Sequence, residues 1–574
     1  MSVEAEAIRV ADANRPVPPA RREWPLPLLL VLGWLLGVAW RVWLARHASM
    51  PFAHTDEDSY LNTARALAGG PGGFSSENET LRRIGYPLLI APAFLLDRDF
   101  ADTYLIVRVV NAALNATLLP LAYLLGRQLL GLGRGPALAA ATLAATVPAA
   151  AFHAAAAMTD AVLAPLLLAW LLAVHRLLDR PGAAAAALGG TLAGACHLVH
   201  SRGVVVVAAY AGLVLALVVR RRLGSAGLLA AVLPVLAAAF ANEAGVRLLG
   251  DTVQLLGSPA DGNALRALTS GSGLAQVLAS AGTQLWYLTV VTFGLAGLGG
   301  ADALRRLCRT GDEPGRWTTG VALAVTVGVA VGAEAVLAGV PDRVPDAIYA
   351  RYVQMLAPFW LLVGVGVLSG LAYRSLLRTA AVTVALLTAG GALIHVRLAH
   401  AVSSGVALRY GDFSAPDLAA LTDGQQGMRP LVGAAIGVAG VLLVVGAARS
   451  RHTRAAVLAV LVLANVATTQ VIAERLIRPM AEVGTPVPAV ADLGIRPVER
   501  VAVSTGVPYQ LRFNLGHQVT WTEVPWFADR PPAAADVVFA RWAPGEPDDW
   551  DGARHRFVRL GGDPERRWAA WRRQ

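Results

Sequence analysis

The sequence predicts an all-α polytopic membrane protein of about 13 transmembrane helices, with a small α/β domain at its C-terminal end. Three observations predict this fold class. The 574-residue chain is 55% hydrophobic and only 15% charged, whereas soluble domains average about 45–50% and about 25%. Apolar runs long enough to cross a hydrocarbon core of ~30 Å recur from Pro25 to about Arg475. Beyond Ile477 the apolar runs become short and strand-like, at Val501–Ser504, Val519–Glu523 and Val537–Phe539, between Gly and Pro breaks.

Hydropathy places the expected spans at about 25–45, 103–130, 136–153, 161–178, 184–200, 203–219, 225–246, 284–304, 317–340, 353–373, 379–397, 430–448 and 455–475. Arginines gather in alternate connections, such as Arg127 with Arg134 and Arg220 to Arg222, and short basic connections face the cytoplasm. This predicts a cytoplasmic tail at 1–24, a membrane domain at 25–475, a first outer loop at 46–102 and an outer α/β domain at 476–574. The net charge of +10 does not indicate a nucleic-acid partner, because the basic residues, all arginine, punctuate apolar runs instead of covering a soluble face.

Three consecutive acids, Asp56, Glu57 and Asp58, open the first outer loop. An ionised side chain at the bilayer centre costs at least about 2.5–3.5 kcal/mol, so these residues must lie at the aqueous end of the bundle. One interpretation is structural, since Thr55 and Asp58 have the spacing of a capping box and acids suit a helix N-terminus. The other is functional, with a carboxylate facing a lipid headgroup. Both hold together if Asp58 caps the helix while Asp56 points into a cleft.

The run from Asp56 resembles the first periplasmic loop of GT-C-fold membrane glycosyltransferases of the lipid A aminoarabinose transferase and protein O-mannosyltransferase (family 39-like) group. In this family an Asp-Glu pair is followed by a Tyr and then by an Ala-Arg pair. The corresponding residues of this chain are Asp56, Glu57, Tyr60, Ala64 and Arg65. Further matches are Tyr86-Pro87-Leu88-Leu89, Arg108, Leu125-Gly126-Arg127, Met158-Thr159-Asp160 and Ala350-Arg351-Tyr352. The chain departs from the family at Arg82-Arg83-Ile84-Gly85-Tyr86-Pro87, where relatives often carry a Glu-Lys-Pro-Pro run.

The resemblance implies a GT-C-like enzyme of the bacterial cytoplasmic (inner) membrane, with its N-terminus inside and its C-terminal domain outside. Such an enzyme moves a hexosyl or pentosyl group from a polyprenyl-phosphate donor to an acceptor in the cell envelope: a polysaccharide, a lipid or a protein hydroxyl. The implied partners are this lipid-linked donor, the envelope acceptor and the membrane lipids.

This reaction needs a base for the acceptor hydroxyl and cations for the leaving phosphate. We expect Asp56 to be the base, with Glu57 and Asp160 shaping the acceptor site. Asp56 and Asp160 are also the candidate ligands for a divalent cation, Mg²⁺ or Mn²⁺, the one cofactor considered. The candidate phosphate-binding arginines are Arg82, Arg83, Arg202 and Arg351, because a guanidinium pairs with two phosphate oxygens. The resemblance adds Tyr60, Arg65 and Tyr352 to the substrate-binding set.

Plainer interpretations stay open for several of these residues. Arg82 and Arg83 could belong to a solvated face of the first loop, and Arg351 with Tyr352 could be an anchor at the membrane interface. Asp160 has the pattern of a helix-start residue, and Arg202 could be an interfacial anchor or half of an internal ion pair. For the whole chain, the alternative function is a transporter or lipid-carrier flippase, although such proteins place ionisable residues near the midplane. A non-catalytic assembly protein with a sugar-binding tail is a third possibility.

Overall fold

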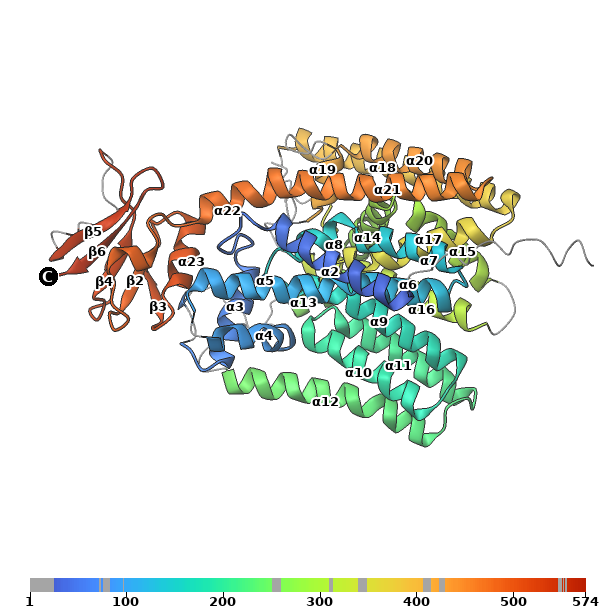
Figure 1. Ribbon diagram of the computed structural model, residues 1–574, viewed down its shortest axis with the longest axis horizontal. Coiled ribbons are helices and arrows are strands. Elements are labelled where there is room, and N and C mark those ends of the chain that lie inside the picture. The colour runs from blue at the N-terminus through green and yellow to red at the C-terminus, as the bar shows by residue number, and fades with distance from the viewer. Residues whose placement is uncertain are drawn as a thin grey trace, which may run out of the picture.

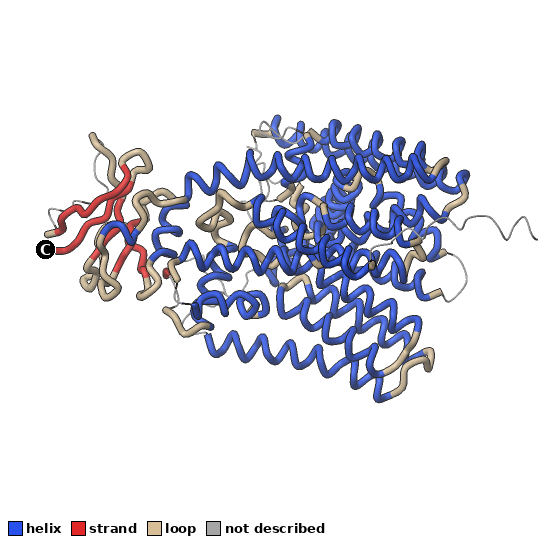
Figure 2. The backbone as a smooth tube through the Cα atoms, in the orientation of Figure 1, coloured by secondary structure: helices blue, strands red, loops and turns tan. Residues whose placement is uncertain are grey.

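The computed structural model describes residues 25–71, 74–75, 83–96, 98–249, 260–308, 313–338, 348–405, 414–422, 429–545, 550, 552 and 555–574. The tail expected at 1–24 lies outside these residues. Over the described chain, a long bundle of helices carries a small sheet domain at one end, as Figure 1 shows. The strands gather at that end, while helices make up the remainder (Figure 2). This architecture confirms the predicted fold class, a helical membrane protein with a C-terminal α/β domain.

Helices follow one another through the membrane part of the chain. They are α2 (Leu26–Leu44), α5 (Phe100–Ala116), α6 (Leu118–Gln128), α7 (Arg134–Ala145), α8 (Pro148–His153), α9 (Asp160–Asp179), α10 (Ala183–Val199), α11 (Gly203–Val219), α12 (Ser225–Leu249), α13 (Ala260–Thr269), α14 (Gly271–Val291), α15 (Leu295–Leu307), α16 (Pro314–Leu337), η3 (Gln354–Leu356), α17 (Ala357–Gly370), α18 (Tyr373–Ser403), α19 (Pro416–Leu421), α20 (Pro430–Ala447), α21 (Arg451–Ile472), the π-helical turn η5 (Ala473–Ile477) and α22 (Arg478–Gly484).

The number of spans differs from the expectation. Each of the thirteen predicted segments is helical over most of its length, but among the described residues eight helices are long and apolar enough to cross a membrane. A ninth is added if α14 and α15, which meet at a bend of 118°, count as one span. The segments at 184–200, 203–219 and 353–373 form shorter apolar helices, and 136–153 divides into α7 and α8. Hydropathy counts apolar residues and does not register where a helix breaks or bends inside the protein.

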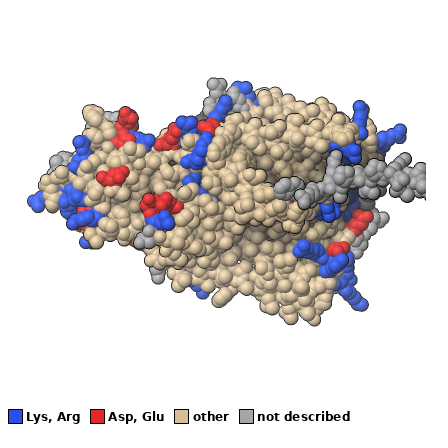
Figure 3. All heavy atoms as spheres, viewed as in Figure 1, with Lys and Arg blue, Asp and Glu red and all other residues tan. Residues whose placement is uncertain are grey.

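Arginines of two connections contact aromatic side chains of other helices. Arg220 stacks over the ring of Trp317 at 5.0 Å, and Arg449 donates to the hydroxyl of Tyr373 at 3.3 Å. In the view of Figure 3, charged side chains gather toward the two ends of the bundle, and the middle of this face is free of them. An uncharged belt between two charged ends is the pattern of a multi-pass membrane protein.

The first loop packs at the opposite end from these connections, beside the sheet domain (Figure 1). It contains α3 (Asp56–Leu67), β1 (Phe74–Ser75), α4 (Gly85–Ile90) and η1 (Ala91–Leu96). The apolar side chains of α3, those of Tyr60, Leu61 and Ala64, are buried inside the protein.

The C-terminal domain is a six-stranded sheet of order β1-β3-β2-β4-β6-β5. Its elements are η6 (Val490–Leu493), β2 (Val501–Ser504), α23 (Tyr509–Gln518), β3 (Val524–Phe527), β4 (Val537–Ala540), β5 (Phe557–Asp563) and β6 (Trp568–Arg573). The strands expected at 501–504 and 537–539 are confirmed; the one expected at 519–523 is wrong, because the strand begins at Val524. The first loop supplies the edge strand β1, which pairs in parallel with β3 at Phe74 and Val524.

Helices α10 and α12 approach each other closely through glycines spaced four residues apart. A Cβ at Gly190 would lie 2.2 Å from the carbonyl oxygen of Ala231, and one at Gly194 would lie 2.9 Å from the Cβ of Ala238. Small residues at this spacing allow two helix backbones to pack in a membrane. The two helices can therefore pack this closely because glycine has no side chain at these positions.

We expect Gly190→Val to lower the free energy of unfolding by about 1–3 kcal/mol, because overpacking forces the two helices apart. Gly212→Val is the matched control, since a Cβ at Gly212 meets nothing within 4 Å. Thermal unfolding of the detergent-solubilised proteins measures both. Equal midpoints for the two variants would contradict the close contact.

Candidate active site

The three acids of the first loop occupy the first turn of α3 and point in different directions. An α-helix turns by about 100° per residue, so consecutive side chains cannot share one partner. Asp56 pairs with Arg351, Glu57 is buried against the bundle, and Asp58 faces the C-terminal domain. Each carboxylate therefore has a separate structural environment.

Glu57 is fully buried, and both of its oxygens accept hydrogen bonds. Its Oε2 accepts from the hydroxyl of Tyr104 at 2.6 Å and from the backbone N–H of Ala157 at 3.0 Å. Its Oε1 accepts from the N–H groups of Phe52 at 3.2 Å and Ala53 at 3.0 Å. Burial raises the pKa of Glu57, although these donors act to lower it. The side chain thus ties the loop to α5 and to the turn that precedes Asp160.

Asp160 is the centre of a buried cluster of ion pairs. It is the first residue of α9, as a helix-start residue should be, but its carboxylate is held by two arginines. Its Oδ1 lies 2.8 Å from Nη2 of Arg202, and its Oδ2 lies 2.8 Å from Nη2 and 3.2 Å from Nε of Arg351. The remaining nitrogen of the Arg351 fork, Nη1, pairs with Asp56. One guanidinium therefore bridges acids from two separate loops.

The cluster is shielded from water to different degrees. The side chains of Asp160, Arg202 and Arg351 are each 6% exposed, whereas that of Asp56 is 21% exposed. Burial alone would lower the pKa of Arg351, but the two carboxylates raise it well above its usual value, so this arginine stays charged. Asp56 is thus the member of the cluster most open to a substrate.

Aromatic side chains line one side of Arg202. Its guanidinium lies 4.7 Å from the ring centroid of Tyr352, and its Nη1 donates to the backbone carbonyl of Tyr352 at 3.3 Å. Tyr349 packs edge-on against Tyr352, and Nε of Arg202 donates to His200 at 3.3 Å. The internal ion pair considered for Arg202 is therefore present, and each nitrogen of its guanidinium group has a hydrogen-bond partner.

Two asparagines of α5, which the sequence analysis did not select, hold the segment around Asp160 in place. Nδ2 of Asn111 donates to the carbonyl of Ala156 at 2.7 Å, and Nδ2 of Asn115 donates to that of Ala161 at 2.8 Å. Both are fully buried. Their spacing of four residues puts both on one face of the helix, a pattern that could have indicated a buried polar contact.

Tyr60 and Arg65, expected to bind substrate, lie elsewhere on α3. Tyr60 is buried edge-on against Tyr86, with ring centroids 5.2 Å apart. Arg65 donates from Nε to the carbonyl of Pro71 at 2.9 Å and from Nη1 to that of Val519 at 3.2 Å. These contacts connect the first loop to itself and to the C-terminal domain.

Arg83, at the point where the chain departs from the family pattern, lies outside the ion-pair cluster. Arg83 is half-buried, and its Nη1 lies 3.2 Å from Nε2 of His197 at the end of α10. Arg82 lies outside the described residues. Of the four candidate phosphate-binding arginines, the structure brings Arg202 and Arg351 together around Asp160.

The predicted capping box is wrong. Thr55 is the N-cap residue of α3, but its side chain makes no capping hydrogen bond. The side chain of Asp58 is instead engaged by His54 and by His517 of the C-terminal domain. The carboxylate that the local sequence pattern assigned to the helix end instead pairs with two histidines, one of them in the C-terminal domain.

The two candidate cation ligands are already paired with an arginine. In the part of the chain that the structure describes, no group of three or more His, Cys, Asp or Glu side chains is arranged so that it could hold a metal ion. Asp56 and Asp160, the pair considered for Mg²⁺ or Mn²⁺, both face Arg351. A cation between them would have to displace this buried guanidinium.

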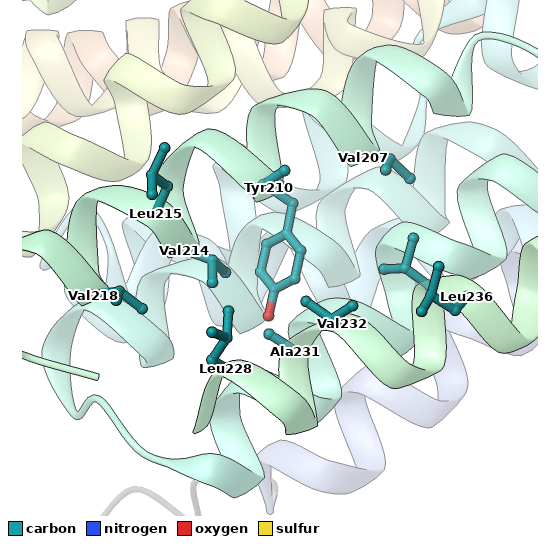
Figure 4. Close-up of a pocket in the computed structure, with 11 residues that line it drawn as sticks. Val207, Tyr210, Val214, Leu215, Val218, Leu228, Ala231, Val232 and Leu236 are labelled. Carbon is teal, nitrogen blue, oxygen red and sulfur yellow. The ribbon is translucent and has the colours of Figure 1, made fainter. Parts of the chain in front are cut away.

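A partly open pocket of about 240 Å³ lies between two helices, as Figure 4 shows, and no residue of the ion-pair cluster lines it. Its lining comes from α11 and α12: Val207, Tyr210, Ala211, Val214, Leu215, Val218, Leu228, Ala231, Val232, Val235 and Leu236. The hydroxyl of Tyr210 already donates to the carbonyl of Ala186 at 2.5 Å. With no charged group in its lining, this cavity suits hydrocarbon, and the ion-pair cluster is the better candidate for catalysis.

No protein-family profile matches the chain, and no curated protein sequence matches it. Among solved structures, it is similar to ArnT from Cupriavidus metallidurans bound to undecaprenyl phosphate, with 13% identity, coverage of 95% of this chain and 98% of that chain, and a TM-score of 0.49. The apo state of the same protein gives 14% identity, the same coverage and a TM-score of 0.47. The arabinosyltransferase EmbB from Mycobacterium smegmatis gives 15% identity over 82% of this chain and 43% of that chain, with a TM-score of 0.41.

We expect Asp160→Asn to lower the free energy of unfolding by about 3–5 kcal/mol, because two buried guanidinium groups lose the carboxylate that they share. Asp302→Asn is the matched control. Asp302 is also buried, but its partners Arg305 and Arg306 are 39% and 44% exposed and can turn to water, so its loss should cost only about 1 kcal/mol. Denaturant unfolding in detergent compares the two, and equal losses would contradict this account of the cluster.

Proposed function

We propose that the protein transfers a sugar from a polyprenyl-phosphate donor to an acceptor hydroxyl at the outer face of the cytoplasmic membrane. One observation carries the proposal: a partly exposed carboxylate, Asp56, shares the fork of Arg351 with the buried Asp160. This pairing supports an arrangement in which a base lies beside a phosphate-binding cation at one end of the membrane bundle. The family motifs at Asp56 and Asp160 in the sequence support the same reaction.

In the proposed reaction, the acceptor oxygen attacks the anomeric carbon of the donor sugar, and the bond from that carbon to the phosphate oxygen breaks. The proton of the acceptor hydroxyl passes to Asp56, and the polyprenyl phosphate leaves with the electron pair of the broken bond. Positioned general bases contribute about 10²–10⁴-fold to such steps. Glu57 has no part in the proton transfer, since its oxygens already accept four hydrogen bonds.

The ion pairs suggest how donor binding prepares the base. Asp56 and Asp160 balance Arg351 and Arg202 in charge, so an arriving phosphate adds negative charge that only the arginines can neutralise. We propose that the phosphate takes the Nη1 side of Arg351 and that Asp56 is thereby released to face the acceptor. Asp160 retains its hold on both arginines through their other nitrogens, which keeps them aligned during the exchange.

Mass spectrometry of cell-envelope lipids from strains with and without the gene tests the proposed donor, because a polyprenyl-phosphate sugar should accumulate when the gene is absent. A flippase would produce the same accumulation. The purified protein in detergent micelles separates the two, since micelles have no compartments to cross. Release of polyprenyl phosphate and a glycosylated envelope acceptor supports the transferase, and an intact donor contradicts it.

We expect Asp56→Asn to lower the transfer rate in micelles by about 10²–10⁴-fold and to leave the protein folded. Asp102→Asn is the control, because Asp102 is an exposed acid in the first turn of α5, outside the cluster. A rate for Asp56→Asn within a few-fold of wild type would contradict the assignment of Asp56 as the base.

We expect Arg351→Lys to raise the KM for the donor by about 10- to 100-fold, because a lysine keeps the charge but loses the fork that pairs with phosphate, worth about 1.5–3 kcal/mol. Arg478→Lys, an exposed arginine on α22, controls for the substitution itself. Initial rates over a range of donor concentrations measure the effect. An unchanged KM with a lowered kcat would place Arg351 outside the donor site.

A further inference from the structure

The carboxylate of Asp58 is shared by two histidines from opposite ends of the chain. Its oxygens lie 3.0 Å from Nδ1 of His54, four residues earlier in the first loop. Its Oδ1 lies 2.7 Å from Nε2 of His517, on helix α23 of the C-terminal domain. The side chains are buried, with 2% of His54 and 1% each of Asp58 and His517 exposed. This cluster takes no part in the proposed proton transfer.

The protonation states of the three groups follow from their hydrogen bonds. An ionised carboxylate only accepts, so His54 must donate through Nδ1 and His517 through Nε2. Burial would raise the pKa of Asp58, but the two histidines lower it to about 2. Burial has the opposite effect on His517, because it lowers the pKa of this histidine. The linkage is therefore a charge-assisted one that persists at neutral pH, and such hydrogen bonds are among the stronger ones in proteins.

Both histidine rings are also held by stacking. His54 stacks on Phe513 of α23, with centroids 4.9 Å apart and an interplanar angle of 18°. His517 stacks on Phe100 of α5, at 4.7 Å and 12°. Helix α23 thus contacts the first loop through Phe513 and the membrane bundle through His517.

Further contacts from the same domain reach the chain on both sides of Asp56. Before it, Nδ2 of Asn514 donates to the carbonyl of Pro51 at 3.0 Å. After it, Arg65 donates to the carbonyl of Val519, and strand β1 joins the sheet. The segment that carries Asp56 is therefore bounded by attachments to the C-terminal domain.

We propose that His517, acting through Asp58 and His54, is a positioning residue for Asp56, so that the C-terminal domain sets the geometry of the catalytic loop. Asp56 and Asp58 share one helical turn, and a movement of that turn would displace Asp56 from Arg351. A displacement of about 1 Å can lower a rate by about 10²-fold. The inference rests on the proposed function for its effect on rate, but not for its effect on the order of the loop.

Two substitutions at His517 in the full-length protein test the proposal. His517→Ala removes the donor to Asp58, whereas His517→Gln keeps a side-chain N–H that can reach the same carboxylate and does not titrate. His555→Gln is the control, because this histidine stacks on Trp550 in the same domain, away from the first loop. Amide hydrogen exchange of residues 52–61, measured by mass spectrometry in micelles, reports the order of the loop without any substrate.

We expect His517→Ala to speed exchange in this segment and to lower kcat by about 10- to 100-fold with little change in the KM for the donor. His517→Gln and His555→Gln should stay within a few-fold of wild type in both measurements. Unchanged exchange in His517→Ala would overturn the proposal, as would faster exchange with an unchanged kcat. If the wild-type protein transfers no sugar, the proposed function fails, while faster exchange restored by His517→Gln would still support the role of His517 in ordering the loop.

Discussion

The first turn of helix α3 constrains the rest of the site, because it carries three ionisable carboxylates on consecutive residues. The helical rotation sends each to a different part of the molecule: to the arginine cluster, to α5 and to the C-terminal domain. Buried carboxylates without partners would be costly, so each direction needs its own donors. The bundle, the turn before Asp160 and helix α23 provide them, and this requirement orders three distant segments around one loop.

Charge balance governs the ion-pair cluster at the mouth of the bundle. Two arginines and two acids stand together with little access to water, and removing either sign alone would leave a buried charge uncompensated. Arg351 makes the connection between the acids, since its fork has nitrogens on two sides. A site that is neutral when empty gains an excess of negative charge when phosphate enters. The exchange proposed for Asp56 follows from this balance.

The C-terminal domain is joined to the first loop by a shared sheet and by side-chain hydrogen bonds. Strand β1 of the loop extends the sheet, and Asp58 accepts hydrogen bonds from a histidine 459 residues away. These contacts explain why the loop can hold several charged residues in fixed positions outside the helical bundle. The small core of the sheet domain, from Val490 to Ala570, gives α23 a rigid base from which to hold them.

The sequence by itself determined the membrane class, the helical segments, the α/β character of the tail and the place of Asp56, Asp160 and Arg351 among the candidates, because hydropathy, charge spacing and short motifs are local properties. Only the tertiary structure decided which arginines surround Asp160, that Glu57 is enclosed by hydrogen bonds, and that Asp58 binds histidines instead of capping its helix. It also decided where helices bend and break. These outcomes depend on partners far apart in the chain, such as Arg202 with Asp160 or His517 with Asp58, whose meeting no local pattern records.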